Sequence, residues 1–159
     1  MVRVHFRATT DLNLCPRYGL RGMSNPENAP YALVADDDDL VRMITTTILE
    51  DTGFHALSAE NGVEAVRLLE RHAGSIILLF TDVEMPGGPD GFELARTTSR
   101  RWPDISIVVA SGGVKPGVGD LPEGAVFISK PFSADVVHDH LDNILPDGRK
   151  PAPLKLRNK

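Results

Sequence analysis

The fold of this chain is decided by the stretch YALVADDDD, residues 31–39. Five residues with the composition of a buried strand give way at once to four aspartates, Asp36 to Asp39. A second apolar run, IILLF at 76–80, leads within two residues to Asp82. Short apolar runs of this length indicate buried strands. Acid therefore follows two strands of the predicted core.

Apolar runs alternate with segments of helical periodicity along the whole body of the chain. Strands are expected at 31–35, 54–59, 76–81, 105–110 and 125–129, and helices at 40–51, 62–71, 91–100 and 134–145. Asp39, Asp90 and Ser133 are the expected helix caps. Alternation of this kind predicts an α/β domain with a doubly wound parallel sheet covered by helices on both faces. Ligands of such domains bind beyond the carboxyl ends of the strands.

Composition narrows the class of protein. The chain has 159 residues, 42% of them hydrophobic and 25% charged, which fits one globular domain. Residues 23–145 carry 8 basic and 20 acidic side chains, so this body is too acidic to bind the DNA backbone directly. No apolar run is long enough to cross a membrane. A single cysteine, Cys15, fits a cytoplasmic protein without disulfides.

The two ends differ from this body. Residues 1–29 show no sustained periodicity and are expected to form a disordered extension, and a translation start at Met23 would place residues 1–22 outside the native protein. Residues 146–159 are rich in proline and lysine, and we expect a disordered basic tail. The domain is thus expected over residues 30–145. The 14 residues after it are too few for a DNA-binding domain.

The strand ends predict a metal-assisted phosphate site. Asp36, Asp37 and Asp82 would meet at one edge of the sheet, where clustered carboxylates need a cation. Carboxylate oxygens with a backbone carbonyl suit Mg²⁺, and Mg²⁺ favours a phosphoryl ligand. Lys130, after the fifth strand, adds a mobile positive charge, and Ser111 a hydroxyl. A carboxylate can also be a nucleophile and form an acyl phosphate.

Five motifs in order resemble the receiver domain of two-component response regulators. They are ALVADDD at 32–38, TDVEMP at 81–86, DG at 90–91, VASG at 109–112 and SKPF at 129–132. The resemblance covers about residues 30–145. It implies a flavodoxin-like sheet of strand order 2-1-3-4-5 and a stand-alone, chemotaxis-regulator-like receiver. It also implies phosphoryl transfer to the chain from a sensor histidine kinase or a histidine phosphotransfer protein, with a protein as output partner.

The resemblance also assigns roles by position. Asp82 matches the phosphorylated aspartate, and Asp36 and Asp37 match the acidic pair that holds Mg²⁺. The backbone carbonyl of Glu84 matches a further metal ligand, and Lys130 matches the lysine that contacts the phosphoryl group. The switch residues are matched by Ser111 and Phe127. On this reading the chain is not an enzyme apart from its own phosphorylation.

Two segments depart from the family pattern. One residue more than usual lies between Pro86 and Asp90, in the loop beside the phosphoacceptor. Residues 112–124 contain five glycines and two prolines where most receivers have their fourth helix. Such a composition opposes a helix, so we expect an irregular segment with at most one helical turn. Phe127 lacks the hydroxyl of a tyrosine, so its switching would depend on packing alone.

Three other interpretations stay open on the sequence. The aspartate run alone could be a solvated helix start, where acids are favoured. A Mg²⁺-dependent phosphatase with an aspartyl-phosphate intermediate could use Glu84, two residues after Asp82, as its acid and base. A phosphorylation-independent binding module could share the fold. The histidines, including His138, show no metal or nucleophile spacing and are expected at the surface.

Overall fold

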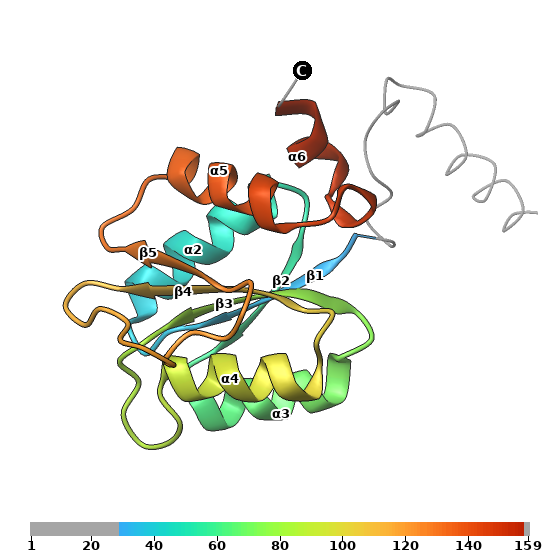
Figure 1. Cartoon of the computed structure of the whole chain (residues 1–159). Coiled ribbons are helices and arrows are strands. Elements are labelled where there is room, and N and C mark those ends of the chain that lie inside the picture. Colours follow the sequence, from blue (N-terminus) through green and yellow to red (C-terminus); the bar gives the residue numbers. More distant parts are fainter. Residues whose placement is uncertain (1–28, 158–159) are drawn as a thin grey trace, which may run out of the picture.

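The computed structural model describes residues 29–157 of the chain (Figure 1). The predicted N-terminal extension therefore lies almost wholly outside the described residues, as do residues 158 and 159. Within the described part, strands and helices alternate from Tyr31 to Ile144, as the periodicity predicts.

A sheet of five parallel strands forms the centre of the domain. Its order is β2-β1-β3-β4-β5, which confirms the predicted topology. The strands are β1 (Tyr31–Ala35), β2 (His55–Ala59), β3 (Ile76–Asp82), β4 (Ser106–Ser111) and β5 (Val126–Ser129). Ala35 pairs with Thr81 and Asp82 pairs with Ala110. The carboxyl ends of β1, β3 and β4 therefore lie at the same edge.

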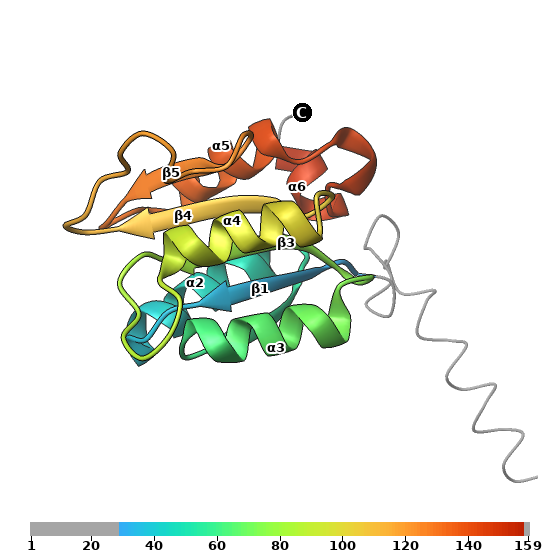
Figure 2. The same ribbon diagram turned by 60° about the horizontal axis from the view of Figure 1, so that its bottom comes forward.

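Helices cover both faces of this sheet (Figures 1 and 2). They are α2 (Asp39–Asp51), α3 (Gly62–His72), α4 (Gly91–Arg101), α5 (Ala134–Ile144) and α6 (Ala152–Arg157). Leu33 and Ala35 of β1 face a core shared with α3 and α4. Ala32 and Val34, between them, face a second core shared with α2, α5 and α6. This alternation is expected of a strand buried on both faces.

The helix caps agree with the sequence at two sites and differ at one. Asp90 and Ser133 cap α4 and α5, as predicted. The cap of α2 is Asp38 and not Asp39, because the Asp38 carboxylate accepts the backbone N–H groups of Leu40 and Val41. Asp39 is already the first helical residue. The prediction failed by one position because any of the four aspartates can cap a helix.

Several apolar side chains of the helices face outward. Leu40 and Ile44 of α2 fall at helical spacing with the buried Leu49, but they are 60% and 46% exposed, and Val136 of α5 is 39% exposed. His138, expected at the surface, is buried. Helical spacing gives the direction of a stripe but not its width, which depends on where the neighbouring element ends. Leu40 and Ile44 therefore belong to an exposed surface near the end of β1.

Between β4 and β5 the structure has no helix, as the glycine and proline content predicted. The Asp120 carboxylate accepts the N–H of Gly117 at 2.7 Å and lies 3.8 Å from the Arg96 guanidinium. Arg96 also donates to the carbonyl of Asp120 at 3.1 Å. The loop is thus irregular but tied to α4.

The C-terminal segment differs from its prediction. Up to Arg157, residues 146–159 are ordered in a 3₁₀ turn, η3 (Asp147–Arg149), and in α6. Leu154 is 1% exposed and belongs to the core with Leu49 and Phe54. Lys150 bridges Asp142 and Asp147 at 2.9 and 2.8 Å. The prediction of disorder was wrong for the described part of this segment. Burial of Leu154 and the ion pairs of Lys150 hold the segment on the domain in spite of its proline- and lysine-rich composition.

Candidate functional site

The site lies at the carboxyl edge of the sheet, where three predicted residues meet. Asp36 follows β1, Asp82 ends β3 and Lys130 follows β5. The Lys130 ammonium donates to Asp36 Oδ2 at 3.0 Å and to Asp82 Oδ1 at 2.9 Å. These residues are up to 94 positions apart in sequence, and only the parallel sheet brings them together. The convergence predicted from the strand ends is therefore observed.

Burial makes these charges interact strongly. Asp36 and Asp82 are 4% and 7% exposed. Burial raises the pKa of Asp82, and the nearby charges of Asp36 and Asp37 act in the same direction, while the hydrogen bond from Lys130 opposes them. Burial opposes the charge of Lys130, but its hydrogen bonds with Asp82 and Asp36 outweigh this and raise the pKa of Lys130. The lysine is thus held as a cation between two carboxylates.

Asp37 completes a cluster suited to a cation. Oxygens of Asp36, Asp37 and Asp82 lie within 4.8 Å of one another, and Asp37 alone of the three is exposed. Three carboxylates against one ammonium leave excess negative charge, which a divalent cation would neutralise. An all-oxygen donor set with one open side suits Mg²⁺, which keeps part of its water shell. The donor set therefore fits the predicted metal.

The turn that carries the acids is held by hydrogen bonds. Asp36 Oδ1 accepts the N–H of Asp38 at 2.9 Å. The Arg42 guanidinium donates to the backbone carbonyl of Asp36 at 2.8 Å. The sequence reasoning missed Arg42. Its position three residues after Asp39, on the first turns of α2, was the available signal.

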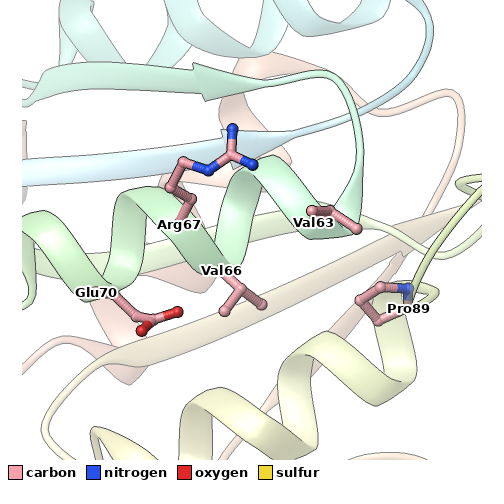
Figure 3. Close-up of a pocket in the computed structure, with 5 residues that line it drawn as sticks. All are labelled: Val63, Val66, Arg67, Glu70 and Pro89. Carbon is pink, nitrogen blue, oxygen red and sulfur yellow. The ribbon is translucent and has the colours of Figure 1, made fainter.

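The loop after Asp82 packs closely on two helices. A Cβ on Gly91 would clash with the carbonyl of Asp82, and a Cβ on Gly62 would clash with that of Pro89. Only glycine permits both approaches. Figure 3 shows Pro89 beside Val63 at the start of α3, where a shallow groove of about 380 Å³ is found. The loop after Asp82 is thus held closely against α3.

The structure places the two predicted switch residues on neighbouring strands. Ser111 is buried at the end of β4, and its hydroxyl oxygen accepts the N–H groups of Gly113 and Val114 at 3.3 and 3.0 Å. Phe127 of β5 pairs with Val109 of β4 and packs, half-buried, against the core under α3 and α4. Ser111 is thus hydrogen-bonded to the irregular loop, and Phe127 packs against the core that β4 shares with α3 and α4.

Comparison with known proteins agrees with this arrangement. A family model, that of the response regulator receiver domain, matches residues 32–142. The chain belongs to the response regulator receiver domain family. Receiver domains act in two-component signalling, and they are typically phosphate-accepting switches that interact with histidine kinases.

Individual relatives of this receiver differ in length. The chain is 32% identical over 116 residues to the response regulator receiver protein CpdR of Brucella abortus, covering 71% of this chain and 94% of that protein. It is 35% identical over 104 residues to the sensor kinase CckA of the same organism, covering 64% of this chain but only 11% of the kinase. The same domain thus occurs in a short receiver protein and in a long kinase.

Solved structures give the same result for the fold. The receiver domain of the hybrid histidine kinase CckA superposes with a TM-score of 0.59 at 28% identity, covering 73% of this chain and 99% of that one. A response regulator receiver protein from Sinorhizobium medicae gives 0.64 at 26% identity, covering 73% and 94%. Among the described residues of this receiver, no helix is long and apolar enough to cross a membrane.

Proposed function

We propose that this receiver is a phosphorylation-dependent signalling switch that accepts a phosphoryl group on Asp82. The proposal depends above all on the contact of Lys130 with both Asp82 and Asp36 at the carboxyl edge of the sheet. A buried carboxylate with a cation on one side and two further acids nearby is the arrangement that a phosphoacceptor requires. The phosphoryl donor is a phosphohistidine of a histidine kinase or of a phosphotransfer protein.

The residues of the site divide the reaction between them. A carboxylate oxygen of Asp82 attacks phosphorus, the phosphorus–nitrogen bond to the donor histidine breaks, and that imidazole keeps the bonding electrons and takes up a proton. Asp36, Asp37, Asp82 and the carbonyl of Glu84 would hold Mg²⁺, which neutralises charge on the transferred group when bound. Lys130 contacts a phosphoryl oxygen and thereby exchanges its bond with Asp82 for one with the new anion.

The switch would follow from Ser111. Its hydroxyl now accepts two N–H groups of the loop after β4. Once it donates to a phosphoryl oxygen instead, its oxygen turns away from the N–H groups of Gly113 and Val114, and the first residues of this loop lose their hydrogen bonds to β4. Phe127 then repacks into the space that Ser111 leaves. The absence of a helix between β4 and β5 makes this loop the output surface, where a protein partner would bind.

The donor would dock on an apolar rim beside the acids. Val41, Ile44, Gly112, Lys130, Pro131 and Phe132 line a pocket of about 390 Å³ there. Leu40 and Met43 of α2 continue this surface, and each is 60% exposed. A donor histidine must approach Asp82 from outside the sheet edge, so its protein covers this rim. An apolar rim at that place therefore favours a protein as phosphodonor over a free small molecule.

Intact mass after incubation with Mg²⁺ and acetyl phosphate, or with a phosphorylated histidine phosphotransfer protein, tests the proposal. The expected result is a gain of one phosphate in the wild type and none in Asp82→Asn. No gain with either donor would favour a phosphorylation-independent binding module. Steady turnover of a phosphate ester would favour the phosphatase, but the side chain of Glu84 is exposed and not turned into an enclosed pocket.

A further inference from the structure

Arg42 lies behind the acidic turn and connects three parts of it. One guanidinium nitrogen donates to the carbonyl of Asp36 at 2.8 Å. The other donates to the Asp39 carboxylate at 2.5 Å and lies 3.8 Å from the carboxylate of Glu60, the residue after β2. The Arg42 side chain is 14% exposed, whereas those of Asp39 and Glu60 are 87% and 70% exposed. The sequestered bond of this group is therefore the one to Asp36.

This bond is not needed to start the helix. Asp38 already caps α2 by accepting the N–H groups of Leu40 and Val41. The exposed pairs with Asp39 and Glu60 contribute little to stability. What the bond to the carbonyl does fix is the plane of the peptide that joins Asp36 to Asp37. Asp37 is exposed, so no packed core holds its side chain. The direction in which that side chain leaves the backbone therefore depends on the orientation of the Asp36–Asp37 peptide.

We infer that Arg42 is a positioning residue for the metal site, acting through the Asp36–Asp37 peptide. The inference goes beyond the family match and rests on the proposed function, because it assumes that the acidic cluster holds Mg²⁺. It assigns to Arg42 a role that its charge alone would oppose. A guanidinium near the cluster repels a divalent cation, whereas a guanidinium that orients Asp37 strengthens cation binding.

The two effects have opposite signs, so the dissociation constant for Mg²⁺ separates them. Arg42→Gln removes both the charge and the forked donor. If orientation dominates, the constant measured by calorimetric titration of the full chain with MgCl₂ rises about tenfold, the scale typical of groups that orient metal ligands. If only the charge acts, the constant falls. The control is Arg71→Gln, which makes the same change of charge at an exposed arginine in the last turn of α3.

Each outcome bears on one proposal or the other. A constant for Arg42→Gln that is unchanged or lower, with wild-type binding intact, overturns the role of Arg42 and leaves the proposed function standing. Wild-type protein that binds no Mg²⁺ overturns both. If Arg42→Gln does not fold, Arg42→Lys replaces it, since it keeps the charge and loses the fork. Its constant should rise by a smaller factor, and an unchanged constant would overturn the inference.

Discussion

At the scale of single residues, the carboxylate of Asp82 occupies an unfavourable position when no metal ion is bound. It is buried near two other carboxylates, and among the described residues Lys130 offsets them. We expect Asp82→Asn to raise the free energy of unfolding at pH 7 without Mg²⁺ by about 1–2 kcal/mol. Urea unfolding measures this, and Glu84→Gln, which removes an exposed carboxylate two residues away, should change it by less than about 0.5 kcal/mol.

Metal and pH should both change this difference. Mg²⁺ stabilises the wild type by mass action, so the difference in free energy of unfolding between wild type and variant should narrow in MgCl₂ and return after EDTA.

The pKa of Asp82 is raised in the folded state, so the folded protein keeps this proton at pH values above the unfolded pKa of 3.8. Wild-type stability therefore falls, relative to Asp82→Asn, as pH rises from 3.8 through the folded pKa. A difference independent of pH would contradict this.

Lys130 should contribute more to the free energy of unfolding than a lysine on the exposed surface does. Lys130→Met leaves Asp36 and Asp82 buried without their shared cation, and we expect a loss of about 2–3 kcal/mol at pH 7. The pKa of Lys130 is raised in the folded protein, so this contribution is complete at pH 7 and is lost only above 10.5. In the double variant with Asp82→Asn, the loss should be smaller than the sum of the two single changes, because Asp82→Asn removes the buried carboxylate that Lys130 neutralises. A double-variant change equal to that sum would show that the two side chains are not coupled.

At the scale of elements, the sequence predicted what depends on local chemistry. The five strands, the caps Asp90 and Ser133, and the missing helix between β4 and β5 follow from apolar runs, capping side chains and glycine content. The convergence of Asp36, Asp82 and Lys130 also follows, because parallel strands end at one edge. The exposure of Leu40 and the bond from Arg42 to Asp36 could not be predicted, since both depend on how α2 sits on the sheet.

The loop between β4 and β5 should owe its order to Asp120. This carboxylate accepts the N–H of Gly117 and pairs with Arg96 of α4. In Asp120→Ala we expect faster hydrogen exchange of the backbone amides over residues 113–120, with a loss of stability below about 1 kcal/mol because the contacts are exposed. Lys115→Ala in the same loop is the control, and equal exchange in the two variants would show that Asp120 does not hold the loop.

At the scale of the whole molecule, the C-terminal segment closes the core on the face of α2 and α5 (Figure 1). Pro151 is buried, and Leu154 belongs to one core cluster with Leu49 and Phe54. Arg149 donates to the carbonyl of Asp104 at 2.7 Å. Composition gave no sign of this role, since only the completed fold offers these side chains a surface. The segment at 146–157 is thus part of the receiver's core and not an appendage.

The last prediction follows from this packing. Leu154→Ala removes a fully buried side chain, so we expect the free energy of unfolding to fall by about 2–4 kcal/mol, as for other leucines truncated in cores. Lys155→Ala, at the exposed neighbouring position, should change it by less than about 0.5 kcal/mol. Urea unfolding of both variants decides. If Leu154→Ala loses as little stability as Lys155→Ala, then α6 does not contribute to the core in solution.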